Sequence, residues 1–337
     1  MDKINYTELH KSVLNIYKDF QKICIEYNLN YYAISGTTLG AALWQGIIPW
    51  DDDIDIAMPT KDYEKFVKIC KKFLPTHLSF SEYIWFGGKL HDKKTTFTNI
   101  NYIHNPKRYN GVFIDIVPLI ALPDDPAKRS LFINDLKNFQ KFGILFDRYQ
   151  DHEYSDSKLN QWRKTILNAY SFGSTNYVMD FSDPRYVLSS KGFIHPTIVK
   201  FEDTTIPISS NYKEDLSIQY GHYKKYPDKK IRESIHAQQS ILKLHTPYDN
   251  LAKEFKQLPK WAQTMFIKKN NNEGSYLKSL YYTQDLLSKT TEELEVNKKK
   301  LETVEKELTL VKSELNNIKD YSKKHPFKTF YTNLKKH

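Results

Sequence analysis

Apolar residues recur at every third or fourth position between Lys11 and Tyr27, and polar residues fill the intervals. This period predicts an amphipathic helix whose apolar face packs on the segment that follows. The stretch "YYAISG" predicts a short strand that ends in a glycine turn, and "TTLGAALWQ" predicts a compact helix closed by Gly46. The run "DIDIAM" then predicts a strand, and "TKDYEKFVKICKKFL" predicts a helix with Thr60 as its N-cap.

Further strands are expected around residues 80–86 and 95–101, and "GVFIDIVPLI" is the most apolar strand of the chain. Residues 126–260 are predicted to be mainly helical, with a strand-like patch at "FIHPTIVKFEDTTIPI". This mixture of strands and helices indicates an α+β protein in which helices surround a mixed sheet core.

A seven-residue repeat marks the segment between Gly274 and Pro326, which contains neither glycine nor proline. The repeated residues are Leu287, Leu294, Leu301, Leu308 and Leu315, and Val304, Val311 and Ile318 follow the last three at a spacing of three. Flanking charges pair with opposite signs at the offset of a parallel coiled coil, so residues 287–318 predict a parallel homo-oligomer. The alternative is a long single helix that folds back on the preceding domain through the same seam.

These patterns divide the chain into a folded domain at residues 1–272, a coiled coil at 273–325 and a basic aromatic tail at 326–337. The tail has no acidic residue, which suits peripheral contact with an anionic membrane, although a short disordered tail is the alternative. No stretch approaches the ~20 apolar residues of a membrane-spanning helix, and the first residues lack the apolar region of a secretory signal. The expected location is therefore cytoplasmic, including a peripheral position on the inner face of the cell membrane.

The net charge of +10 suits anionic partners such as phospholipid surfaces or phosphorylated substrates. The lysines are spread widely and no nucleic-acid-binding signature is present, so nucleic acid is not expected as a partner.

Four aspartates occupy five positions in "WDDDIDIAM". Because side chains alternate along a strand, Asp51, Asp53 and Asp55 would share one face. Asp52 would point to the other face and tolerate substitution best. Carboxylates buried without a counter-charge are costly, and a divalent cation removes that conflict. Ligands that are all oxygen favour Mg²⁺ or Mn²⁺ over Zn²⁺. The alternative is a solvated turn before a strand.

Two other features extend this acidic stretch. Asp115 is an isolated carboxylate inside the apolar strand "GVFIDIVPL", where it either completes a metal site or caps a neighbouring loop. In "ISGTTLGAAL", Gly36 allows a sharp turn and Thr37 lies at the start of a helix, whose N-terminal N–H groups and dipole favour a phosphate. Such a turn opens many helices that bind nothing. Together, however, the features predict an anion cradle, a metal-binding strand and a third acid.

This order resembles the polymerase-β-like nucleotidyltransferase fold. More specifically, "YYAISGTTLGAALWQGIIPWDDDIDIAMPTKDYEKF" resembles the signature of the LicD family of phosphotransferases, which includes the fukutin-related enzymes. Further matches are "GGKLHDKKTTF", "RYNGVFIDIVPLIALPDD" and "FEDTTIPISSNYKEDLSIQYGHYKKYP", so the resemblance covers residues 10–230.

The resemblance implies transfer of a phosphorylated alcohol, phosphocholine first of all, from a CDP-linked donor to a hydroxyl of a surface glycan. The acceptor would be a lipopolysaccharide, teichoic acid or capsule, either bound to a lipid carrier or free of one, and CMP would leave. The implied metal ligands are Asp53 and Asp55, with Asp51 assisting. Asp115 would be the third acid and the general base.

The resemblance also implies residues around these acids. Gly36 and Thr37 would lie near the donor phosphates, and Lys89 would contact one of them, with a surface lysine as the alternative. The loop of residues 109–111 would shape the pocket. Glu202 and Asp203 would support the site or contact the acceptor.

Three other functions remain open at this stage. The first is transfer of glycerol phosphate or ribitol phosphate. The second is a true nucleotidyltransferase that uses a nucleoside triphosphate, since the same acids serve that chemistry. The third is a non-catalytic oligomeric scaffold.

Overall fold

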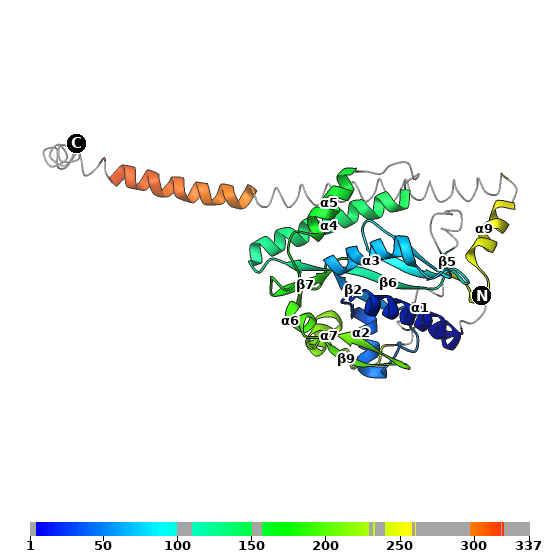
Figure 1. Ribbon diagram of the computed structural model, residues 1–337. Coiled ribbons are helices and arrows are strands. Elements are labelled where there is room, and N and C mark those ends of the chain that lie inside the picture. The colour runs from blue at the N-terminus through cyan, green and yellow to red at the C-terminus, as the bar shows by residue number, and fades with distance from the viewer. Residues whose placement is uncertain are drawn as a thin grey trace. The chain divides into compact units, whose positions relative to one another are not determined.

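The computed structural model describes residues 5–99, 110–149, 157–228, 240–257 and 297–317, together with Arg232, Lys260 and Lys319. The chain forms two compact units, residues 1–272 and 273–337 (Figure 1). Among the described residues, no helix is both long and apolar enough to cross a membrane.

The first unit contains the helices and strands that position the site. Its helices are α1 (Tyr6–Glu26), α2 (Ser35–Trp44), α3 (Thr60–Phe73), α4 (Pro126–Tyr149), α5 (Ser157–Leu167), α6 (Ser190–Ile194), α7 (Tyr212–Tyr220) and α9 (Tyr248–Gln257). Its strands are β1 (Tyr32–Ala33), β2 (Asp55–Pro59), β3 (Leu78–Glu82), β4 (Gly88–Asp92), β5 (Thr96–Asn99), β6 (Phe113–Leu122), β7 (Tyr177–Asp180), β8 (Leu188–Ser189), β9 (Thr197–Phe201), β10 (Thr204–Ile208) and β11 (Ser240–Lys243).

The main sheet is mixed and has the order β1-β2-β6-β4-β3, with β7 pairing to the distal end of β6 and β8 pairing to β7. Strands β2 and β6 run parallel, whereas β4 and β7 lie antiparallel to β6. Two small antiparallel pairs, β9 with β10 and β5 with β11, stand apart from it. The α+β class and the mixed sheet are therefore confirmed.

Alternation along β6 separates the core from the site. Ile114 and Ile116 point into the largest hydrophobic cluster, to which α1 and α3 contribute their apolar faces (Figure 1). Val117 and Leu119 point to the opposite face, where Phe193 of α6 packs. Successive side chains of a strand lie on opposite faces, so Asp115 shares the second face. The apolar residues of β6 thus anchor the strand while its single acid, Asp115, faces away from the main core.

The predictions for the first hundred residues need three corrections. Thr60 is not an N-cap: it begins α3, the N-cap is Pro59 and no side chain caps the helix. Gly46 does not close α2, because the left-handed C-cap is Gln45, with φ 55°. Strand β4 was not predicted, since the glycines before Lys89 are typical of a loop and the strand is held by its two neighbours.

The prediction of mainly helical structure for residues 126–260 is only partly right. Helices α4, α5, α6, α7 and α9 lie there, and strands β9 and β10 occupy the predicted strand-like patch, but strands β7, β8 and β11 were not predicted. These three strands are two to four residues long. Segments this short contain too few residues for alternation to be recognised against a helical pattern.

In the second unit, residues 297–317 form a helix. The heptad residues described there are all exposed: Leu301 60%, Val304 57%, Leu308 52%, Val311 53% and Leu315 50%. Leu287, Leu294, Ile318 and the tail at 326–337 lie outside the described residues, so membrane contact by the tail stays a prediction.

Candidate active site

The site is built where β2 and β6 run side by side. Their register places Asp55 opposite Asp115. The Asp115 N–H donates to the Ile54 carbonyl at 2.8 Å, which fixes this register at the start of β2. Carboxylate oxygens of Asp53, Asp55 and Asp115 all lie within 4.8 Å of one another. The parallel strand pair thus brings Asp115 to two acids that lie about sixty residues earlier in the chain.

The N-terminus of α2 borders these acids and holds one of them. Thr37 is buried, and its Oγ1 accepts a hydrogen bond of 2.7 Å from the Asp55 N–H. The Asp55 carbonyl in turn accepts from the Ile34 N–H at 3.2 Å. The hydroxyl of Thr37 therefore binds the backbone of β2. The first N–H groups of α2 lack intrahelical partners, so they suit an anion.

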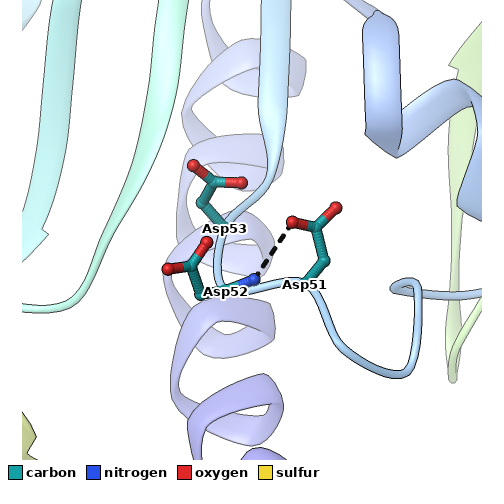
Figure 2. A group of neighbouring side chains, drawn as sticks. All are labelled: Asp51, Asp52 and Asp53. Carbon is teal, nitrogen blue, oxygen red and sulfur yellow. Dashed lines mark hydrogen bonds between the residues drawn. The ribbon is translucent and has the colours of Figure 1, made fainter. Parts of the chain in front are cut away.

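Asp51 lies at the same helix end. A Cβ atom on Gly36 would stand 3.0 Å from Asp51 Oδ2, so the carboxylate packs tightly on the backbone of this glycine. The Asp51 carboxylate also accepts from the Asp52 N–H at 3.2 Å (Figure 2). Burial, followed by the charges of Asp53 and Asp52, raises the pKa of Asp51 to about 8. Oxygens of Asp51, Asp52 and Asp53 form a second group within 4.8 Å.

Asp52 is 1% exposed, with the buried Ile54 and Ile56 following at alternate positions. Alternation therefore holds across the bend that precedes β2. Asp52 is therefore no longer expected to tolerate substitution best, because replacing a buried carboxylate disturbs the core around it.

Lys89 reaches the site from the neighbouring strand β4, in register with Asp115. Its Nζ lies 2.6 Å from Asp115 Oδ1 and 3.5 Å from the centroid of the Phe113 ring. Burial alone would lower the pKa of Lys89, but the Asp115 carboxylate outweighs burial and the pKa is raised. This lysine is thus not a surface lysine, and its positive charge lies directly against the Asp115 carboxylate.

Two contacts hold the loop between α2 and the aspartates. His10 Nε2 donates to the Asp51 carbonyl at 2.8 Å. The Glu202 carboxylate accepts from the Ile47 N–H at 2.9 Å, and Gly46 packs so closely on this carboxylate that a Cβ would overlap it. Glu202 therefore supports the site from a distance. Asp203 does not share this role: it is 66% exposed in its side chain and pairs with Lys18 at 2.6 Å.

The loop before β6 is described from Asn110 onward, so Tyr109 lies outside the described residues. The Asn110 carbonyl accepts from the Phe97 N–H at 2.5 Å. A Cβ on Gly111 would overlap the Asp92 carbonyl, so this glycine permits a close backbone crossing. These contacts anchor the start of β6, and the role of residues 109–111 in shaping the pocket stays a prediction.

Two residues near the acids were not predicted. Asp180 ends β7, opposite Leu119, and its Oδ1 accepts from the N–H and the hydroxyl of Ser182 at 2.6 and 2.7 Å. Burial raises the pKa of Asp180 to about 6, with Asp115 among the smaller contributors. Tyr220, at the end of α7, has a pKa raised by burial and then by Asp55 and Asp51. An acid in the apolar run "VMDF" is a signal for Asp180, whereas nothing in the sequence marks Tyr220.

The electrostatics of the cluster fit a hard cation. Burial, then Asp53 and Asp115, raise the pKa of Asp55 well above its usual value. Carboxylates that repel one another in this way are stabilised by either a proton or a positive ion. Since the donor atoms are all carboxylate oxygens, the residues present suit Mg²⁺ or Mn²⁺.

Comparison with known proteins found one family model and several proteins similar to this chain. A family model described as "LicD/FKTN/FKRP, nucleotidyltransferase domain" matches residues 28–164, which include β1 to β6 and the acidic cluster. The lipopolysaccharide cholinephosphotransferase LicD of Haemophilus influenzae is 26% identical over 275 residues, spanning 72% of this chain and 100% of that protein.

Two rickettsial proteins described as uncharacterized also match. RP689 of Rickettsia prowazekii is 25% identical over 211 residues, covering 55% of this chain and 77% of the relative. RT0683 of Rickettsia typhi is 32% identical over 185 residues, covering 48% of this chain and 58% of the relative. The family match, the full-length similarity to the Haemophilus protein and the mixed sheet with its clustered acids agree, so residues 28–164 are similar to the LicD nucleotidyltransferase domain.

Proposed function

We propose that the chain is a phosphotransferase that moves a phosphorylated alcohol, phosphocholine first of all, from a CDP-linked donor to a hydroxyl of a surface glycan such as lipopolysaccharide. The observation that carries this proposal is the cluster of Asp53, Asp55 and Asp115, whose oxygens lie within 4.8 Å of one another on a parallel strand pair. The similarity to a protein named as a lipopolysaccharide cholinephosphotransferase supports the donor group and the acceptor class.

In the proposed reaction the acceptor oxygen attacks the phosphorus of the alcohol phosphate, the bond from that phosphorus to the bridging oxygen breaks, and CMP leaves with the bridging oxygen. Mg²⁺ or Mn²⁺ bound by Asp53 and Asp55 would supply neutralisation of the donor pyrophosphate. Thr37 fixes the backbone of Asp55, and the N-terminus of α2 presents N–H groups toward phosphate oxygens.

Asp115 accepts the proton of the acceptor hydroxyl in this proposal. A general base must be ionised before it can accept, and Lys89 at 2.6 Å favours the ionised form. A base must also reach the acceptor proton directly or through one water. The 7% exposure of Asp115 keeps its carboxylate out of bulk solvent.

The test is release of CMP by the purified full-length chain with Mg²⁺ across a series of CDP-alcohols. We expect release from CDP-choline, and we expect Asp55→Asn to lower kcat by a factor of at least about 10³, since it removes a metal ligand. Asp203→Asn is the matched control, because this exposed acid pairs only with Lys18 and should leave kcat unchanged.

Each alternative function has its own outcome in this assay. If CMP is released only from CDP-glycerol or CDP-ribitol, the transferred group is glycerol phosphate or ribitol phosphate instead of phosphocholine. Pyrophosphate release from a nucleoside triphosphate would overturn it in favour of a nucleotidyltransferase. Full transfer activity in Asp115→Asn would remove the evidence for an acid-dependent active site, and an inactive CDP-alcohol series without pyrophosphate release would favour the scaffold.

We also propose that the second unit joins copies of the chain in a parallel coiled coil. Apolar heptad residues of helix 297–317 stand 50% to 60% exposed, which is costly for a helix on its own. Three charge pairs among the described residues, Lys300 with Glu305, Glu307 with Lys312 and Glu314 with Lys319, have the offset and opposite signs of neighbouring parallel helices.

A further inference from the structure

Three aromatic rings gather next to the aspartate stretch, and the middle ring, that of Trp50, stands nearly at right angles to each of the other two. Trp44 and Trp50 have ring centroids 5.5 Å apart and planes inclined at 85°. Trp50 and Tyr226 have centroids 5.1 Å apart and planes inclined at 79°. Tyr226 is 58% exposed and both tryptophans are partly exposed, so the group is open to solvent. Perpendicular rings form the walls of a box rather than a flat stacking platform.

The chain places this box at the edge of the site. The Asp51 N–H donates to the Ile48 carbonyl at 2.9 Å, which closes a turn with Pro49 and Trp50 at its corners. Trp50 therefore directly precedes Asp51, and its Cα lies within about 11 Å of the Asp53 Cα.

Tyr226 comes to the box from the loop that follows α7. The last residue of that helix is Tyr220, whose pKa is raised by burial and then by Asp55 and Asp51. The end of α7 therefore borders the acidic cluster, and the loop after it carries Tyr226 to the Trp50 ring.

A cation already lies over two of the rings. The guanidinium carbon of Arg232 is 5.6 Å from the centroid of Trp50 and 4.8 Å from that of Tyr226. Its Nε donates to the Pro227 carbonyl at 3.2 Å. Ring faces attract cations through their quadrupole, so the chain itself shows that these faces accept positive charge.

We propose that Trp50 and Tyr226, braced by Trp44, receive the trimethylammonium head of a choline donor in the place that the Arg232 guanidinium holds. This inference rests on the proposed function and names the group that the site selects. A trimethylammonium group has no N–H to donate, so aromatic faces are its best partners, whereas Arg232 can give its donors to water and to Pro227. The short ethylene linker of choline requires the head to bind near the phosphate, which matches the position of Trp50 beside Asp51.

The test is calorimetric binding of CDP-choline and CDP-glycerol to the full-length chain and to the variants Trp50→Leu and Tyr226→Leu. We expect wild type to prefer CDP-choline by about tenfold, and each variant to lose most of that preference. Phe73→Leu, which removes a 64% exposed ring from the end of α3, is the matched control and should keep the preference. Arg232→Ala should retain or strengthen choline binding, because it vacates the ring faces.

Several outcomes would overturn the inference. One is an unchanged preference in both ring variants. Another is equal weakening of CDP-choline and CDP-glycerol, which would make the rings a general support or a sugar platform. A third is loss of choline binding in Arg232→Ala. CMP release is measured in the same proteins to separate the two proposals. If CDP-choline is turned over but both ring variants keep the preference for CDP-choline, only the inference about the aromatic box fails. If choline binding depends on the rings but CDP-choline is not turned over, only the proposed function fails.

Discussion

Replacing Thr37 with valine tests how the chain holds its metal-binding acid. Valine keeps the shape of threonine and removes only the hydroxyl that accepts the Asp55 N–H at 2.7 Å. Thr37 is 5% exposed, so water has little access to the N–H that loses its acceptor. The substitution therefore leaves a buried donor without its partner directly at the carboxylate we assign to the metal.

The size of the effect follows from that geometry. A buried polar group left without a hydrogen bond costs about 1–3 kcal/mol. For a domain of this size, each kcal/mol corresponds to a shift of about 2–4 °C in the midpoint of thermal unfolding. A loosened Asp55 should also bind Mn²⁺ more weakly, by roughly tenfold, the low end of what changes in groups that orient metal ligands produce.

The assay combines thermal unfolding with calorimetric titration of Mn²⁺. Thr38→Val is the matched control, because Thr38 is equally buried and its hydroxyl donates to the Ala33 carbonyl at 2.8 Å instead of touching an acid. We expect both valine variants to lose stability and only Thr37→Val to lose Mn²⁺ affinity. Thr37→Ser should restore both. A folded Thr37→Val protein with wild-type Mn²⁺ affinity would refute the reasoning.

Three further predictions address the rest of the molecule. The pKa of Asp51 is raised to about 8, so the metal-free fold should lose stability as pH rises from about 4 to 8. The gain in melting temperature from Mg²⁺ should therefore be larger at about pH 8 than at pH 6. An equal gain at both pH values would contradict this. Gly46→Ala should lower the free energy of unfolding by about 1–3 kcal/mol, because its Cβ overlaps Glu202. Chemical denaturation should show a smaller loss when Glu202 is also replaced with alanine, whereas additive losses would argue against the contact. Leu308→Asp should reduce the oligomer measured by light scattering, while Leu310→Asp, at an exposed position outside the heptad seam, should not; a monomeric wild type would exclude the coiled coil.

Local alternation was sufficient to predict much of the site. Along residues 52–56 the buried residues alternate with the partly exposed acids Asp53 and Asp55, as a strand pattern requires. The isolated acid of β6 was recognisable for the same reason, since Ile114 and Ile116 on the core face leave Asp115 on the other. Periods of this kind depend only on neighbouring residues, and the sequence contains them directly.

What could not be predicted depends on pairing between distant strands. The ion pair of Lys89 with Asp115 requires the antiparallel register of β4 on β6, and no local pattern specifies that register. Asp180 joins the acidic face because β7 pairs with the distal end of β6. The face of Asp52 was predicted correctly, but its tolerance to substitution was not, because this face packs in the core, where Asp52 is 1% exposed.

The most direct test of the central claim is the anomalous difference map of a crystal grown with Mn²⁺. A peak about 2.0–2.3 Å from carboxylate oxygens of Asp53, Asp55 and Asp115 is the predicted result. It would require Lys89 to release at least one oxygen of Asp115, from which it lies 2.6 Å away. A peak confined to Asp51 and Asp52, or a crystal saturated with Mn²⁺ in which Lys89 still pairs with Asp115 and no peak stands on the three acids, would contradict the account.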